Sequence, residues 1–225
     1  MIDVIIPTIL NTQYQIFEYT LNELNSSKVI NKIIIIDNTK DQSFLSEYAK
    51  CITDKITIIN GYDDELYVNG SWNMGVSLAT AENYILLNDD ILVNRIIYEI
   101  IDTHMADQNI SLMTILTKNN VKLDDYIRLN SINMKDFTIS TTNNIPNGRQ
   151  GWFISGRTNE YVPIPSQLKI FYGDDWIYRK AQNKKVMIDN LNVSHFQSSS
   201  VNKNINKLKP MIDQDRVEWY KINKG

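Results

Sequence analysis

Short apolar runs alternate with amphipathic helical patterns through the first half of the chain, and this alternation is the strongest constraint on its fold. Residues 4–7 form one apolar run, and residues 32–37, with four consecutive isoleucines, give the clearest one. Runs of this length are typical of strands that are buried on both faces of a sheet. Between them lies a stripe with the spacing of a helix face: Tyr14, Phe17, Leu21 and Leu24. This order favours an α/β fold in which helices flank a mainly parallel central sheet.

The same reasoning predicts further elements along the chain. Strands are expected at residues 56–59, 84–88, 111–117, 151–156 and 186–188, and helices at 42–50, 70–81, 94–107, 174–183 and 210–222. Asn11 or Thr12 is expected to cap the first helix. Residues 119–150 are rich in Asn, Ser and Thr, so loops with short strands are expected there. No internal repeat or linker interrupts the pattern, and we expect a single domain over residues 1–225.

Composition excludes several classes of protein. The 225 residues are 43% hydrophobic and 22% charged, as in globular proteins and unlike disordered or collagen-like chains. A net charge of −3 argues against a nucleic-acid partner, which would need a basic surface. Cys51 is the only cysteine, so no internal disulfide can form. Together with the lack of a signal peptide and of any apolar run of 18 residues, this predicts a cytoplasmic protein without a transmembrane segment.

Two adjacent carboxylates and an amide, Asn88, Asp89 and Asp90, stand where the strand at residues 84–88 ends. Oxygen ligands of this kind suit Mg²⁺ or Mn²⁺, which often share their coordination with a substrate phosphate. Ligands of α/β sheets bind at the carboxyl ends of the strands, where these residues fall. A polar turn is the simpler explanation, because Asn and Asp also favour turns for backbone reasons.

A second acidic pair, Asp174 and Asp175, starts the helix expected at residues 174–183 and stands beside Trp176. A carboxylate in this setting is a candidate general base. Capping and the helix dipole alone also favour carboxylates at this position, so the pair has a structural explanation as well.

Three other places carry polar groups suited to a ligand. His195 would complete a metal site begun by an aspartate, although a lone histidine in a strand is usually a satisfied polar residue. Asp37 ends the most apolar strand, where a carboxylate either accepts the N3–H of uracil or thymine or simply begins a loop. Residues 69–75, which include Asn69, Asn73 and Gly75, suit a close approach to phosphate or ribose, or close packing of a helix. They match neither GxGxxG nor a P-loop.

Taken in order, these residues resemble the family 2 glycosyltransferases with the GT-A fold. The resemblance covers nearly the whole chain, through residues 4–8, 36–38, 69–75, 84–90, 173–176 and His195. Its most specific part is the strand-ending acidic motif followed about 85 residues later by Gly-Asp-Asp-Trp. The resemblance implies a GT-A fold, a nucleotide-sugar donor and a divalent cation, Mn²⁺ or Mg²⁺.

The resemblance also implies a role for each motif. Nucleotide-sugar binding is implied for Pro7, Thr8, Asp37, Asn69, Asn73, Gly75, Asn88 and Asp89, with Asp37 reading the base. Asp90 and His195 are the implied metal ligands, and Asp175 is the implied catalytic base with Asp174 as its acidic neighbour. The border between donor sugar and acceptor is implied for Gly151, Trp152, Phe153 and Trp176. Residues 1–110 would form the nucleotide-binding half, and residues 111–225 the acceptor and catalytic half with a C-terminal helix.

The expected reaction is an inverting, metal-dependent transfer of a sugar from a UDP- or dTDP-type donor to a hydroxyl acceptor, expected to be a glycan. One departure is Asn88, which replaces the first aspartate of the DxD motif and removes one negative charge from the site. Two alternatives stay open. One is a module that binds a sugar nucleotide or carbohydrate without catalysis. The other is a sugar-nucleotidyltransferase, which would need a glycine-rich basic loop where Pro7 and Thr8 stand.

Overall fold

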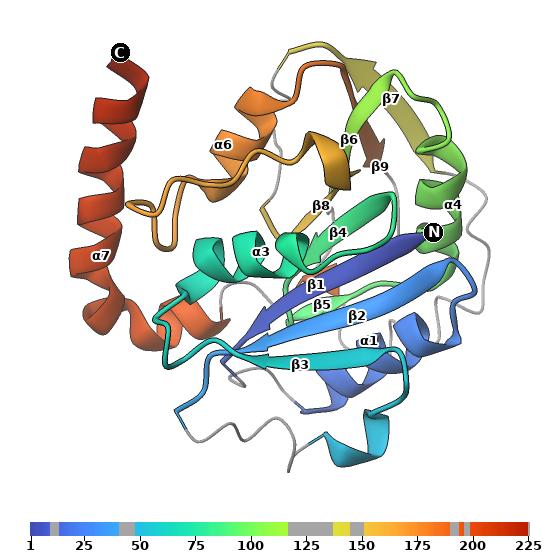
Figure 1. Ribbon diagram of the computed structural model, residues 1–225, viewed down its shortest axis with the longest axis horizontal. Coiled ribbons are helices and arrows are strands. Elements are labelled where there is room, and N and C mark those ends of the chain that lie inside the picture. The colour runs from blue at the N-terminus through green and yellow to red at the C-terminus, as the bar shows by residue number, and fades with distance from the viewer. Residues whose placement is uncertain are drawn as a thin grey trace.

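The computed structural model describes residues 1–9, 14–40, 48–116, 137–144, 151–189, 194–195 and 199–224. Its centre is an eight-stranded sheet with the order β3-β2-β1-β4-β8-β6-β9-β7 (Figure 1). The strands are β1 (Ile2–Thr8), β2 (Ile30–Asp37), β3 (Ile56–Asn60), β4 (Asn83–Leu87), β6 (Ile110–Ile115), β7 (Thr138–Thr142), β8 (Phe153–Arg157) and β9 (Lys184–Asp189). A separate two-stranded sheet consists of β5 (Ile91–Leu92) and β10 (Ser194–His195).

The sheet is mixed, with its parallel part formed by the first half of the chain. β1 pairs in parallel with both β2 and β4, and β2 pairs in parallel with β3. β8 then runs antiparallel between β4 and β6, while β9 is parallel to β6 and antiparallel to β7. The α/β architecture and the parallel strands expected from the apolar runs are therefore confirmed.

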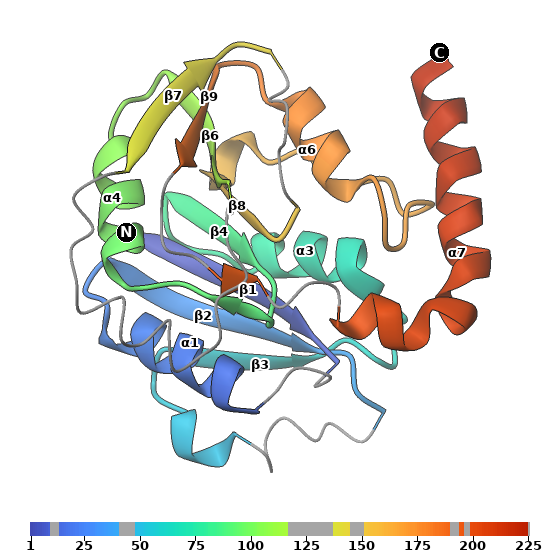
Figure 2. The same ribbon diagram turned by 180° about the vertical axis from the view of Figure 1, so that it is seen from behind.

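Helices cover both faces of the sheet. Seen from behind, α1 (Tyr14–Ser26) and α4 (Ile96–His104) lie in front of the strands (Figure 2). The opposite face carries α3 (Tyr67–Ser77), α6 (Gly173–Lys180) and part of α7 (Ser199–Lys224). Two 3₁₀ turns, η1 (Ala49–Cys51) and η2 (Thr158–Glu160), complete the described elements. None of the helices in these ranges combines the length and the apolar character needed to cross a lipid bilayer.

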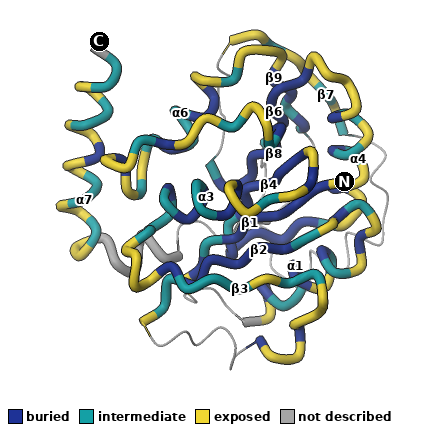
Figure 3. Tube along the Cα trace, viewed as in Figure 1, coloured by how far each residue is buried: buried dark blue, intermediate teal, exposed yellow. Residues whose placement is uncertain are grey.

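Each face of the sheet has its own apolar core. Three residues of the stripe predicted for α1, Phe17, Leu21 and Leu24, are inaccessible to solvent. These side chains pack with the side chains of Val4 and Ile33 on the α1 and α4 face. On the other face Trp72 and Val76 of α3 and Ile177 of α6 pack with inward residues of β1, β2 and β4. Figure 3 shows that buried residues concentrate in the central strands, whereas α7 carries mainly exposed and half-buried positions.

Two helices, α3 and α7, differ most from their predicted bounds, whereas α4 and α6 differ from theirs by one to three residues at each end. α3 was expected at residues 70–81 but spans Tyr67–Ser77. It ends early because the Asp3 carboxylate accepts the backbone N–H groups of Thr80 (2.5 Å) and Ala81 (2.9 Å), which turns the chain into β4. The terminal helix was expected to start at Pro210 but starts at Ser199, with Pro210 inside it. Figure 1 shows α7 bent into two parts, as expected for a helix that contains an internal proline.

Three predictions fall wholly or partly outside the described residues. Residues 119–150, where loops with short strands are expected, are described only at 137–144, which contain β7. The cap at Asn11 or Thr12 lies outside the described residues. Most of the helix expected at residues 42–50 also lies outside them, and its described end forms the 3₁₀ turn η1.

Candidate functional site

The carboxyl ends of three adjacent strands, β2, β1 and β4, bring polar side chains together. Thr8 at the end of β1 pairs in register with Asp37 at the end of β2. The Thr8 hydroxyl donates a 2.6 Å hydrogen bond to Oδ2 of Asp89, which follows β4. Thr8, Asp37, Asp89 and Asp90 are all buried. This edge of the sheet therefore contains three buried carboxylates, a costly arrangement unless donors or a cation compensate their charge.

β10 places the backbone of His195 beside the acidic turn. β10 pairs antiparallel with β5, and His195 lies opposite Ile91, the residue directly after Asp90. The backbone therefore brings together the two residues expected to bind metal, although they are more than 100 positions apart. Among the side chains that the structure describes, which exclude that of His195, no three or more His, Cys, Asp or Glu residues form a group that could hold a metal ion.

The second acidic pair occupies the first turn of α6. Tyr172, directly before the helix, adopts the left-handed conformation with φ 64°. The side chain of Asp174 lies against Gly151, where an added Cβ would be 3.0 Å from Oδ2 and 3.1 Å from Cγ. This contact brings the start of α6 to the residues that precede β8.

The two acidic motifs meet across the start of β8. Gly151 contacts Asp174, and the carbonyl of the next residue, Trp152, accepts the backbone N–H of Asn88 at 3.0 Å. The antiparallel pairing of Leu87 with Phe153 continues this contact into the sheet. Two consecutive residues thus connect the strand-ending motif with the acidic start of α6.

The aromatic residues expected at the donor and acceptor border are buried or half-buried. Phe153 has no exposed surface and Trp152 is 3% exposed, and both belong to the core on the α1 and α4 face. The role of these residues at the border between donor sugar and acceptor stays a prediction. Trp176 is half-buried, and its Nε1–H donates to the carbonyl of Val162 at 3.2 Å. The Lys180 ammonium lies 4.4 Å from the centre of the Trp176 ring.

Two of the residues expected near the nucleotide, Asn69 and Asn73, make hydrogen bonds within the protein. The Asn69 amide donates to the carbonyls of Leu168 (3.2 Å) and Phe171 (3.1 Å). The Asn73 amide donates to Ile164 O and accepts from Ile164 N and the Tyr161 hydroxyl, each at 2.8 Å. These side chains hold residues 161–171 against α3.

Gly75 lets α3 approach the sheet closely. A Cβ at this position would lie 2.2 Å from Cγ2 of Ile5 in β1, well inside contact distance. These contacts favour the packing interpretation of residues 69–75, and a nucleotide contact at Asn69, Asn73 and Gly75 stays a prediction.

Asp37 is 1% exposed, and part of its carboxylate is already bound. Its Oδ1 accepts the backbone N–H of Thr39 at 2.9 Å and the hydroxyl of the same residue at 2.6 Å. Pro7, half-buried, precedes Thr8 at the end of β1.

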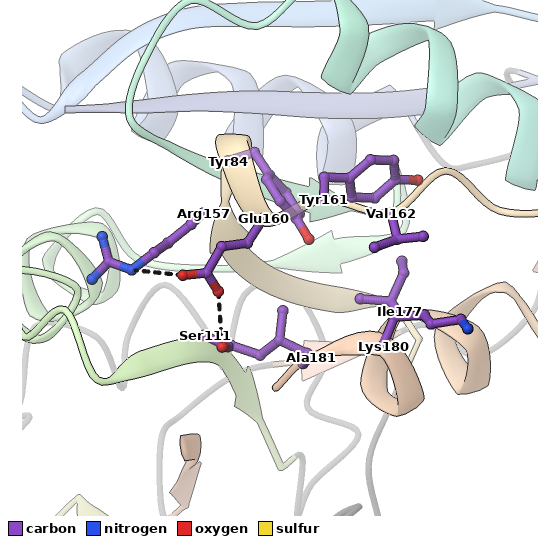
Figure 4. A pocket seen from close by; sticks show the side chains of 10 residues that line it. Tyr84, Ser111, Arg157, Glu160, Tyr161, Val162, Ile177, Lys180 and Ala181 are labelled. Carbon is purple, nitrogen blue, oxygen red and sulfur yellow. Dashed lines mark hydrogen bonds and ion pairs between the residues drawn. The ribbon is translucent and has the colours of Figure 1, made fainter. Parts of the chain in front are cut away.

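Two hollows lie away from these motifs. One is a cavity of about 20 Å³ near the amino end of β4, which is close to the volume that one water molecule needs. Figure 4 shows the Tyr84 hydroxyl directed into it, while Glu160 turns to Ser111 and Arg157. Burial, followed by the proximity of Tyr161, raises the pKa of Tyr84 well above its ordinary value, so the hydroxyl stays protonated.

The other hollow is a mainly apolar groove of about 370 Å³ between α3 and residues 165–169. Asn73, Met74 and Leu168 are among its lining residues. It lies on the outer side of α3, and neither acidic motif lines it.

One functional candidate escaped the sequence analysis. Asp215 of α7 has no exposed surface, and its carboxylate accepts three backbone N–H groups from Lys169, Ile170 and Phe171. The sequence contains a pattern that could have indicated it. Asp215 stands within an apolar stripe of helical spacing, which includes Ile212, Trp219 and Ile222.

Comparison with known proteins supports the fold and leaves the activity open. No protein-family model and no curated protein sequence matches the chain. Among solved structures, S. aureus TarS 1-349 is similar with a TM-score of 0.60 and 14% identity, over 95% of this chain and 64% of that one. TarS 1-349 in complex with UDP is similar with a TM-score of 0.60 and 15% identity, over 86% of this chain and 59% of that one. GalNAc-T7 with UDP, GalNAc and Mn²⁺ is similar with a TM-score of 0.62 and 14% identity, over 87% of this chain and 43% of that one.

These similarities confirm the GT-A fold that the sequence motifs imply. At such low identity they extend no further than the fold. The chain also spans less than two thirds of the length of the structures that it matches.

Proposed function

We propose that this chain is a glycosyltransferase that moves a sugar from a nucleotide-sugar donor of UDP or dTDP type to an acceptor hydroxyl, with a glycan as the acceptor. The transfer would invert the anomeric carbon and depend on a divalent cation. The observation that carries the proposal is the meeting of the two acidic motifs across Gly151 and Trp152. The nucleotides and Mn²⁺ in the solved complexes of proteins with the same fold support it.

The donor would bind at the carboxyl ends of β1, β2 and β4. Thr8 and Asp89 are already joined by a hydrogen bond, and Pro7, Asp37 and Asn88 stand at the same edge. This is the edge at which α/β sheets bind their ligands. Residues 1–110 would therefore hold the nucleotide, and residues 111–225 would supply the base and meet the acceptor.

Asp90 and His195 would hold the divalent cation. A carboxylate and an imidazole are both suitable ligands for Mn²⁺, and two protein ligands leave coordination positions for a diphosphate and water. When bound, the cation would neutralise charge on the departing nucleoside diphosphate. The buried Asp89 and Asp90 suit this role because a cation offsets the cost of enclosing two carboxylates.

Asp175 would act as the general base. An acceptor hydroxyl is a weak nucleophile at neutral pH, and Asp175 would accept its proton while the oxygen attacks the anomeric carbon. The bond between that carbon and the diphosphate oxygen breaks as the new bond forms. One in-line displacement of this kind inverts the configuration of the sugar. Asp174, held against Gly151, would keep the start of α6 next to the donor.

A binding module without catalysis is the second candidate. It is favoured by Asn88, which lowers the charge of the metal motif, and by the amides of Asn69 and Asn73, which are committed to residues 161–171. Such a module would bind nucleotide sugar without releasing nucleoside diphosphate.

A thermal-shift panel tests the proposal. The full chain is heated with UDP, dTDP and GDP and with their sugar conjugates, each with and without Mn²⁺. A ligand at about 100 times its dissociation constant adds roughly 2.7 kcal/mol of stability, so binding raises the melting temperature visibly. Release of nucleoside diphosphate is then measured with the conjugates that bind. Binding with turnover supports the transferase, binding without turnover supports the module, and no shift with any nucleotide contradicts both.

A further inference from the structure

The loop that leads into α6 is held in an unusual conformation. Residues 168–172, which we call the α6 entry loop, end at Tyr172, whose φ of 64° is in the left-handed region. A bulky residue other than glycine adopts this region only when its surroundings impose it. Asp174 and Asp175 follow within three residues, so the conformation of Tyr172 sets the direction in which α6 begins.

Asp215 holds this loop through its backbone. Oδ1 accepts the N–H of Lys169, and Oδ2 accepts the N–H groups of Ile170 and Phe171, all at 2.8 Å. The carboxylate is fully buried. Hydrogen bonds to an ionised acceptor are stronger than neutral ones, so three of them at one carboxylate fix the loop firmly.

Asn69 holds the same loop from the opposite side. Its amide donates to the carbonyls of Leu168 and Phe171, and its backbone N–H donates to the carbonyl of Lys169 at 3.1 Å. Asp215 of α7 thus accepts hydrogen bonds from the backbone N–H groups of the loop, and Asn69 of α3 donates hydrogen bonds to its carbonyls.

α7 also contacts the two ends of α6 through aromatic and polar side chains. The Trp219 ring stacks on Tyr172 with centroids 5.2 Å apart and an angle of 10° between the planes. The guanidinium of Arg179, in the last turn of α6, lies 5.0 Å from the centre of the Trp219 ring and also contacts Asn223. Figures 1 and 2 both show the loop before α6 reaching α7.

We infer that Asp215 is a positioning residue that fixes Asp175 at the reaction site. The inference rests on the proposed function, because it assigns Asp215 a use in the same transfer. Asp215 does not touch the reacting atoms. It acts through the entry loop, whose geometry places the first turn of α6 against Gly151.

The test compares three variants of the full chain. Asp215→Asn keeps the size of the side chain but replaces one carboxylate oxygen by an NH₂ group. This group cannot accept a hydrogen bond from the backbone N–H that it faces. Trp219→Leu removes the stacking on Tyr172 and leaves the buried carboxylate intact, which guards against a failure of Asp215→Asn to fold. Asp213→Asn is the matched control, because Asp213 is exposed on the same helix and pairs only with Lys209 among the described residues.

UDP-GlcNAc with Mn²⁺ is the first donor probe, followed by the other conjugates of the thermal-shift panel. We expect Asp215→Asn and Trp219→Leu to lower kcat about 10- to 100-fold while KM for the donor stays within about twofold, because misplacing a catalytic group by an ångström has effects of this size. Amide exchange at residues 169–171 should be faster in Asp215→Asn. Asp213→Asn should match the wild type in every measurement.

The outcomes separate this inference from the proposed function. Wild-type kcat in a folded Asp215→Asn variant, with active wild type and inactive Asp175→Asn, overturns the positioning role alone. A parallel change of KM and kcat also overturns it, because general loosening of the fold explains that result. Absence of turnover by the wild type with every donor of the panel overturns the proposed function and the positioning role together.

Discussion

Asp174 and Asp175 are neighbours in the first turn of α6, but their surroundings give them different capacities. The Asp174 side chain lies against Gly151, so its position is fixed by contact with the residues before β8. Asp175 projects about 100° further around the helix axis, because an α-helix has 3.6 residues per turn. The fixed carboxylate is suited to holding the helix start, and its neighbour is suited to receiving a proton from an acceptor.

Replacing Asp175 by Asn should abolish transfer and leave the fold intact. General-base catalysis contributes about 10²–10⁴ in rate, and an amide cannot accept the proton. We expect nucleotide release in the presence of acceptor to fall by that factor, with the melting temperature and donor binding close to those of the wild type. Asp64→Asn, in the exposed turn after β3, is the control for the same chemical change. Full transfer by Asp175→Asn would rule out its role as base.

The sequence indicates some of these residues more readily than others. Asp37, Asp89 and Asp90 stand out because they directly follow apolar runs, and a parallel sheet brings strand ends together. The amides of Asn69 and Asn73 are ambiguous in the sequence, because the same side chain binds a ligand or tethers a backbone. Their partners in residues 161–171 lie about 90–100 positions away, and nothing local indicates which backbone groups need them.

At the scale of elements, the contact of α3 with β1 depends on the absence of a side chain. Gly75 faces Ile5, and an added methyl group would lie 2.2 Å from Cγ2 and 2.7 Å from Cγ1. Ile5 is fully buried in the sheet, so it has no room to move away. The glycine therefore sets the distance between the helix and the sheet, and with it the position of the loop that Asn69 and Asn73 hold.

Gly75→Ala should destabilise the protein, whereas Gly70→Ala in the same helix should be nearly neutral. Overpacking of a close-packed core costs about 1–3 kcal/mol, which outweighs the gain in helix propensity. At Gly70 the nearest atom to an added Cβ is Leu66 Cβ at 3.3 Å, which a small adjustment accommodates. Urea unfolding of both variants measures the difference. Equal stability of the two would show that α3 is not held at this distance by Gly75.

The regular elements follow from the sequence, and the bounds set by distant contacts do not. Apolar periodicity predicts α1 and the parallel strands because those patterns are local. The end of α3 is set by Asp3, which lies 77 and 78 positions before the amides that it binds. The sequence predicts a start of α7 at Pro210, because proline is often the first residue of a helix. In the structure Pro210 lies inside α7, which starts at Ser199. β5 and β10 are two residues each, too short for any periodicity.

At the scale of the molecule, the sheet separates two cores, and the core beneath α3 and α6 contains polar aromatic groups. Tyr84 is 1% exposed there and packs edge-to-face on Tyr161, with ring centroids 5.4 Å apart. Burial raises the pKa of both phenols, and for Tyr84 the neighbouring Tyr161 adds to the effect. Ionisation of either hydroxyl is therefore disfavoured in the folded state, which couples the stability of the fold to pH in the alkaline range.

Stability should therefore fall as the pH rises above about 10, the ordinary pKa of tyrosine. Below that pH both states keep the phenol protons. Above it the unfolded chain releases them while the folded chain retains them, so the unfolded state binds fewer protons and the free energy of unfolding decreases. Tyr84→Phe should reduce this decrease, as seen in urea unfolding between pH 8 and 11, whereas Tyr220→Phe, at a position 61% exposed on α7, should leave it unchanged. An identical pH dependence in wild type and Tyr84→Phe would mean that Tyr84 does not link the α3 and α6 core to alkaline unfolding.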